Sequence, residues 1–287
     1  MNPPASFTLM SYNIFHGGAG RMDAIAEIVR EAAPDLLGIE EADDEEAIAK
    51  LAQDAGMTYV HGLANRSHHV AFLSRFPLLE STNHPHPGVM RKTLLEAHIQ
   101  LPTGEPLILF VTHLSAAATA LGERRRLREM EAILGSIGDR ADRPHLFLGD
   151  YNAVAPGDGL AVEGLTTHYA RRIARPRRDG VPRRHRRARA FGAWLDRGLQ
   201  NGWQTPESLL PRDLVRRVLE AGYLDCYREL HPEEPGYTFP APDPAIRLDY
   251  IFAPPVMRPR LLSCEVVDVP AVSDASDHRP LLARFAI

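Results

Sequence analysis

The sequence predicts a protein of the α/β class, because short apolar stretches of strand length alternate along the chain with stretches of helical periodicity. The apolar run at 146–148 is closed by Gly149 and Asp150, which indicates a short buried strand that runs into a sharp turn. Apolar residues recur at helical spacing within Ile25–Ala32, and Pro34 ends that helix. The chain of 287 residues is long enough for one large domain or two small ones.

Strands in the first half of the chain are expected to end in polar side chains. The strand predicted at Phe7–Ile14 carries Asn13 at its end, and the strand at Asp35–Ile39 runs into Glu40 and Glu41. A helix then opens with four acidic residues at 43–46, which suit its N-terminal dipole, and Gly56 closes it. Further strands are predicted at Thr58–Val60, Val70–Ser74, Leu94–Gln100 and Leu107–Val111, the last two joined as a hairpin that runs into His113.

The second half of the chain departs from this pattern and then returns to it. A helix is predicted at Glu123–Leu134, before the strand that ends in Asp150. Between about residues 155 and 235 two helical stretches, 188–199 and 212–221, replace the strands. We interpret this region as a variable insertion, because strands resume afterwards. These later strands are expected at Arg247–Phe252, Leu261–Val267 and Leu281–Phe285.

The composition and short motifs of the chain favour a globular protein and argue against several other classes. Apolar residues make up 44% of the chain and charged residues 24%, as in ordinary globular proteins. No stretch is long and apolar enough for a membrane helix and no signal peptide is visible, so we expect a cytoplasmic protein. Cys226 and Cys264 lie in apolar surroundings and are expected to be buried free thiols. The chain has no Walker glycine loop and no Gly-x-Ser-x-Gly, which argues against a nucleotide kinase or a serine hydrolase.

Positive charge is concentrated in one segment. Residues 171–189 hold ten arginines and one aspartate. The rest of the chain holds 23 basic and 36 acidic residues, a net charge of −13, whereas the whole chain carries −4. Two interpretations are open: a solvated surface loop, or an arm that binds the phosphates of a polyanion such as a nucleic acid. Few aromatic residues lie within the segment, so base stacking is not expected.

Asp150 and Asn152 are two residues apart at the end of a predicted buried strand, so their side chains can point to the same side. A carboxylate and an amide placed together suit a metal-bound phosphate, although the same residues are common in an ordinary Asx turn. The other strand ends add similar groups. Oxygen ligands such as Glu41, Asp277 and the amide of Asn13 suit Mg²⁺ or Mn²⁺. Asp249 and His278 can form a carboxylate–imidazole pair.

Six short motifs, in order along nearly the whole chain, resemble those of the endonuclease/exonuclease/phosphatase superfamily, which includes DNase I-like and exonuclease III-like nucleases and neutral sphingomyelinases. The run Gly-Ile-Glu-Glu-Ala at 38–42 resembles the usual Leu-Gln-Glu motif, with Glu40 in place of the glutamine. The other motifs are Ser-Tyr-Asn-Ile at 11–14, Thr-His-Leu at 112–114, Gly-Asp-Tyr-Asn at 149–152, Arg-Leu-Asp-Tyr-Ile at 247–251 and Ser-Asp-His-Arg-Pro at 276–280.

The resemblance implies a single domain over residues 1–287 with a four-layer α/β sandwich: two packed mixed sheets flanked by helices. It also implies metal-dependent hydrolysis of a phosphate ester, with Mg²⁺ or Mn²⁺ held by Glu41, Asn13 and Asp277. Asp249 would orient His278, which is either a base or a phosphate ligand. Asp150 and Asn152 would orient water and phosphate, and His113 would contact phosphate or protonate the leaving group.

The substrate stays open at this stage. Nucleic acid ranks first, and a phospholipid or an inositol phosphate is the alternative, because these branches share every motif. A non-catalytic binding protein on the same fold is the contrary class, but such proteins lose motif residues that this chain keeps. Arg91 is a further candidate for a phosphate contact, against the simpler interpretation of a surface arginine.

Overall fold

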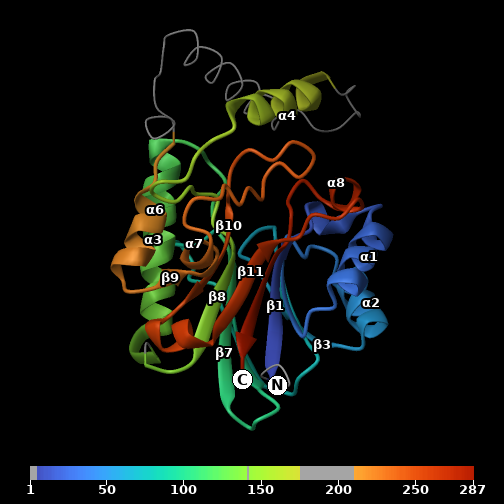
Figure 1. Cartoon of the computed structure of the whole chain (residues 1–287), viewed down its shortest axis with the longest axis vertical. Coiled ribbons are helices and arrows are strands. Elements are labelled where there is room, and N and C mark those ends of the chain that lie inside the picture. The colour runs from blue at the N-terminus through green and yellow to red at the C-terminus, as the bar shows by residue number, and fades with distance from the viewer. Residues whose placement is uncertain (1–4, 141, 175–209) are drawn as a thin grey trace.

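The structure is a computed structural model that describes residues 5–140, 142–174 and 210–287. These residues form two six-stranded mixed sheets that pack face to face (Figure 1). The first sheet contains β1 (Ser6–Asn13), β2 (Leu36–Glu40), β3 (Thr58–Gly62), β4 (Val70–Ser74), β11 (Leu261–Val266) and β12 (Leu281–Ala286). The second contains β5 (Leu78–His84), β6 (Leu94–Gln100), β7 (Pro106–His113), β8 (His145–Asp150), β9 (Leu224–Asp225) and β10 (Asp249–Ala253).

The two sheets have the same central arrangement. Their strand orders are β11-β12-β1-β2-β4-β3 and β5-β6-β7-β8-β10-β9. Each has one parallel pair at its centre, β1 with β2 and β7 with β8, and antiparallel strands on both sides of that pair. Because parallel strands end at the same edge of a sheet, the carboxyl ends of all four central strands can contribute to one site.

Helices cover the two outer faces, which completes the predicted four-layer sandwich (Figure 1). On the first sheet lie α1 (Met22–Ala32), α2 (Glu45–Ala55) and α8 (Val272–Ala275), and on the second lie α3 (Ala120–Ile137) and α6 (Asp213–Glu220). The remaining described helices are α4 (Val162–Ala174), α7 (Cys226–Leu230) and the 3₁₀ turns η1 (His16–Gly18), η2 (Gly138–Arg140) and η4 (Pro255–Arg260).

The main apolar core fills the space between the sheets and includes Leu148 and Val111. Gly38 on β2 lies where the sheets approach closely, since a Cβ at this position would lie 2.7 Å from a Leu148 methyl group. Cys226 and Cys264 are buried in the same core as free thiols, as predicted. Burying such apolar side chains is the principal force that holds the sheets together.

Most predicted elements are confirmed, with some differences. The structure adds β5, which was not predicted because this edge strand is largely exposed and polar and has no apolar alternation. Within 155–235, where two helices and no strand were predicted, it also adds α4, α7 and the two-residue strand β9, which pairs with β10. Helix α6 confirms the helix predicted at 212–221, whereas the one predicted at 188–199 lies outside the described residues. The single domain over 1–287 stays a prediction. None of the described helices has the length and apolar character that crossing a membrane requires.

Candidate active site

The polar strand ends meet at the end of the sandwich opposite the start of β1 and the end of β12 (Figure 1). Strand registers pair Asn13 with Glu40, and His113 with Asp150. Strand β10 runs antiparallel to β8 and therefore begins at this end, with Asp249 opposite Asp150. His278 lies just before β12. We call Asn13, His113, Asp150, Asn152, Asp249 and His278 the Asp150 centre.

One carboxylate oxygen organises this centre. Oδ2 of Asp150 lies 3.0 Å from Nδ2 of Asn13 and 3.0 Å from Nδ2 of Asn152. It also lies 3.2 Å from Nε2 of His113 and 3.8 Å from Nε2 of His278. Burial alone would raise the pKa of Asp150, but His113 and His278 hold it below its usual range. Asp150 is therefore an ionised hydrogen-bond acceptor with a buried side chain.

The local backbone permits this convergence. Gly149 has a φ of +144°, and a Cβ there would lie 1.8 Å from the Thr112 carbonyl oxygen, so only glycine lets the end of β8 approach β7 so closely. Asn152 has a φ of +49°, a left-handed conformation that asparagine tolerates better than most residues. Its backbone N–H donates to Oδ1 of Asp150 at 2.8 Å. The Asx turn and the functional placement therefore coexist.

Asp249 and His278 form the predicted pair. Nδ1 of His278 lies 2.9 Å from Oδ2 of Asp249, and both side chains are buried. Burial lowers the pKa of His278, but the Asp249 and Asp150 carboxylates outweigh that effect and raise it well above 6.5. His278 is therefore an imidazolium at neutral pH. Its backbone N–H donates to Oγ of Ser276 at 3.1 Å, which fixes the loop that carries it.

The imidazole ring of His113, in contrast to that of His278, is neutral at neutral pH. Burial, assisted by the ammonium of Lys92, lowers the pKa of His113 to about 4 despite the neighbouring Asp150. With a neutral ring, the contact to Asp150 places the proton on Nε2, and Nδ1 has no hydrogen-bond partner among the described residues. Lys92 itself is buried and donates to the Leu114 carbonyl oxygen at 2.8 Å, and burial lowers its pKa to about 8.

Glu40 lies fully buried beneath this centre. Burial, together with the Asp249 and Asp150 carboxylates, raises its pKa well above 4.5. Its Oε1 accepts a hydrogen bond from Oγ of Ser11 at 3.0 Å. A protonated glutamate is a neutral side chain of nearly the same shape as glutamine. The raised pKa of Glu40 therefore favours a neutral side chain at the position of the family's glutamine.

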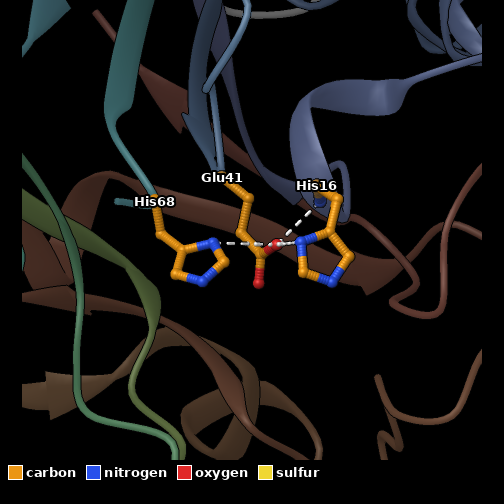
Figure 2. A group of neighbouring side chains, drawn as sticks. All are labelled: His16, Glu41 and His68. Carbon is orange, nitrogen blue, oxygen red and sulfur yellow. Dashed lines mark hydrogen bonds and ion pairs between the residues drawn. The ribbon is translucent and has the colours of Figure 1, made fainter. Parts of the chain in front are cut away.

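Glu41 lies between two histidines, His16 and His68 (Figure 2), and the ring of His68 lies 5.7 Å from that of His113 in the Asp150 centre. Its Oε2 lies 3.5 Å from Nδ1 of His16 and 3.1 Å from Nδ1 of His68, and it accepts a hydrogen bond from the His16 backbone N–H at 2.7 Å. Burial would raise the pKa of Glu41, but the bond from His68 and the nearby His113 lower it strongly. We call His16, Glu41 and His68 the Glu41 cluster, one of two groups of described residues with metal-ligand geometry.

The other two predicted metal ligands, Asn13 and Asp277, make contacts of their own, and their role as ligands stays a prediction. The Asn13 side chain binds Asp150 and, through Oδ1, the backbone N–H of Phe15 at 3.0 Å. Asp277 is half-buried and acts electrostatically on Arg21 and Tyr12, and it is not a member of the Glu41 cluster. His16 and His68 were not predicted as site residues, because neither belongs to a recognised motif.

The neighbouring basic residues also differ from expectation. Arg91 is exposed, whereas the adjacent Lys92 is buried beside His113. The two residues form a bend just before β6, and this bend leaves Arg91 in solvent while Lys92 points inward. The buried cation next to a predicted catalytic histidine is therefore Lys92, which the sequence did not single out.

Helix α4 lies beyond the strand ends on the same side of the molecule as the site (Figure 1). The ring of His168 on α4 lies 5.1 Å from that of Phe239, which lies 4.9 Å from that of His278. Arg171, the first residue of the Arg-rich segment 171–189, is exposed on this helix and pairs with Asp243. Residues 175–189 of the segment lie outside the described ranges.

Comparisons with known proteins agree with this architecture. The model of the Endonuclease/Exonuclease/phosphatase family matches residues 10–278. An AP endonuclease from Archaeoglobus fulgidus is similar in structure, with a TM-score of 0.67 and 18% identity over 98% of this chain and 100% of that one. No curated protein sequence matches this chain significantly.

Two further similar structures were solved with DNA. The 3′ phosphatase NExo from Neisseria, bound to a product DNA hairpin, has a TM-score of 0.64 and 18% identity over 97% of this chain and 99% of that one. TDP2 from D. rerio, complexed with a single-strand DNA product, has a TM-score of 0.63 and 17% identity over 98% of this chain and 99% of that one. At these identities the likeness shows the shared fold.

Proposed function

Because this chain belongs to the endonuclease/exonuclease/phosphatase family, we propose that it hydrolyses phosphodiester bonds in a nucleic acid with the help of Mg²⁺ or Mn²⁺. The convergence of four side-chain nitrogens on one buried oxygen of Asp150, three of them within 3.2 Å and that of His278 at 3.8 Å, carries the proposal. Holding such a carboxylate ionised in a buried site costs free energy, and chemistry at a strand-end site is a reason to retain it.

The charge states support a role for each residue in this proposal. Asp150, an ionised acceptor, orients the attacking water, and Asn152 positions it from the side. The His278 imidazolium, steadied by Asp249, donates a hydrogen bond to a phosphoryl oxygen, where negative charge increases in the transition state. Neutral His113 contacts the phosphate or the leaving oxygen. A divalent cation held by Glu41 would supply further neutralisation of the phosphoryl oxygens when bound.

Two observations favour a nucleic acid as the substrate. Arg171 on α4 begins the Arg-rich segment at the same end of the molecule as the site, and a polyanion would otherwise be repelled by a body of net charge −13. Two of the similar structures hold DNA products. The same residues could act on any phosphodiester, so the choice of substrate requires a direct measurement.

The test is a substrate panel with Mg²⁺, Mn²⁺ and a chelator. The panel contains single- and double-stranded DNA, RNA, sphingomyelin vesicles, inositol phosphates and bis(p-nitrophenyl) phosphate. We expect cleavage of a nucleic acid that the chelator abolishes. Asp150→Asn should lower kcat by about a thousandfold or more, whereas Asp54→Asn, on the surface of α2, should have no effect.

Each other result has a definite meaning. Cleavage of phospholipid or inositol phosphate alone would overturn the proposal of a nucleic-acid substrate, but it would still support phosphoesterase activity. If none of the substrates is cleaved and no cation binds, the result would support a non-catalytic binding protein with this fold.

A further inference from the structure

We propose that the Glu41 cluster binds a first-row transition-metal ion, such as Mn²⁺, through His16 and His68 as well as Glu41, and that it prefers this class of ion to Mg²⁺. The inference deepens the proposed function, because it names the cation of that site and rests on it for the purpose of the ion. The observations that carry it are the spacing of the donor atoms, their chemistry and the backbone that holds them.

The donor atoms have the spacing of ligands on one ion. Nδ1 of His16 and Nδ1 of His68 lie 3.5 Å and 3.1 Å from Oε2 of Glu41, and the three donors lie within 4.8 Å of one another. Adjacent ligands with metal bonds of about 2.1 Å are separated by roughly 3.0–3.4 Å in octahedral or tetrahedral sites. Figure 2 shows both rings turned toward the carboxylate from opposite sides.

The chemistry of the donors selects the ion. Mg²⁺ takes oxygen ligands and keeps several waters, whereas first-row transition-metal ions accept imidazole nitrogen, Fe²⁺, Ni²⁺, Cu²⁺ and Zn²⁺ more strongly than Mn²⁺. Glu41 alone would satisfy Mg²⁺, but two imidazoles beside it add affinity only for ions that accept nitrogen. A set of one carboxylate and two histidines also leaves open positions for water or a phosphoryl oxygen.

The backbone at this cluster is unusual. His16, Glu41 and His68 have φ values of 52°, 59° and 65°, the left-handed region that residues with a Cβ rarely adopt. Each conformation costs free energy, and such positions concentrate at functional sites. The three residues come from separate segments, after β1, after β2 and before β4, so a shared local sequence effect does not explain them.

A second carboxylate between histidines provides an internal contrast. Glu96 lies 2.8 Å from Nε2 of His84 and 2.7 Å from Nε2 of His98, and Arg140 lies 3.2 Å from it. The arginine already neutralises Glu96, and these residues lack metal-ligand geometry. Among the described residues Glu41 has no Lys or Arg within ion-pair distance, so the groups that pair with its charge are the two histidines.

The experiment is Mn²⁺ binding to the full chain without substrate, followed by electron paramagnetic resonance. Pulsed measurements should detect ¹⁴N from coordinated imidazole, and Mg²⁺ should displace Mn²⁺ only at about tenfold excess or more. The double variant His16→Asn with His68→Asn should lose the ¹⁴N signal and bind Mn²⁺ about 10–100-fold more weakly, with little change for Mg²⁺. Asparagine is chosen because it tolerates the left-handed backbone.

Controls separate this proposal from the proposed function. His84→Asn, at the contrasting Glu96 site, should leave Mn²⁺ binding unchanged, and Glu41→Gln should weaken both ions. Thermal unfolding of each variant confirms that it is folded. Wild-type protein without a ¹⁴N signal, equal affinity for the two ions, or a folded double variant with wild-type Mn²⁺ affinity would each overturn the inference. Because no substrate is present, a failure of hydrolysis leaves this result standing.

Discussion

The Asp150 centre and the Glu41 cluster lie at the same end of the sandwich but are built differently. In the first, Asp150, Asn13 and Asp249 lie at the ends of regular strands, and the Asp150 side chain is 2% exposed. In the second, three residues outside the strands have a strained, left-handed backbone, and the His16 side chain is 37% exposed. The Asp150 centre is therefore preorganised by strand register, whereas the Glu41 cluster lacks such support and is expected to be completed by an ion.

The largest expected effect would come from breaking the Asp249–His278 pair. Asp249→Asn and His278→Ala should each lower kcat by about a thousandfold, and the double variant should be little worse than the more damaging single variant, because the two groups act as a unit. Steady-state kinetics on the substrate found in the panel measures this. Mn²⁺ affinity should stay near wild type in all three variants, since the Glu41 cluster is untouched. Losses that multiply in the double variant would show that the residues act independently.

A smaller effect is expected on the pH profile. The raised pKa of His278 keeps the imidazolium at neutral pH, so kcat/KM should fall only as pH rises through a value above 6.5. In Asp249→Asn this alkaline limb should move to lower pH, because a negative charge that raises the His278 pKa is removed. Glu41, whose pKa is lowered, stays ionised far below neutrality and should contribute no limb between about pH 6 and 8. An alkaline limb that does not move would contradict the assignment of His278 as the cationic donor.

The smallest effect is expected for substitutions in the Arg-rich segment, which should change neither the Asp150 centre nor the Glu41 cluster. Deleting 171–189 would damage α4, which extends to Ala174, so the better variant is Arg171→Gln with Arg172→Gln. Glutamine is a comparable helix former. The salt dependence of DNA binding should flatten by about one log–log unit for each phosphate that the variant no longer binds, while hydrolysis of bis(p-nitrophenyl) phosphate stays unchanged. Arg258→Gln on η4 is the matched control. An unchanged slope would assign these arginines to a solvated surface.

Much of the Asp150 centre was predictable from sequence, because its residues terminate strands whose apolar pattern is local. Asn13, His113, Asp150 and Asp249 each follow or begin such a run. Asp150 and Asn152 do meet, but through an Asx turn with a left-handed Asn152 rather than through the strand alternation on which the prediction rested. Family motifs then distinguished Glu41 from Glu40 as the metal ligand, and this stays a prediction. In the structure Glu40 is buried and its pKa is raised, while Glu41 faces the two histidines.

Tertiary structure decided the rest, because contacts between distant segments depend on how the sheets pack. Asn13 meets Asp150 across 137 residues only because β1 and β8 face each other between the two layers. His16 and His68 reach Glu41 through loops whose left-handed backbone no local pattern indicates. The choice of Lys92 over Arg91 depended on which side of one segment faces the core. Local periodicity encodes strands and their ends, whereas the partner of each end is determined only when the buried faces come together.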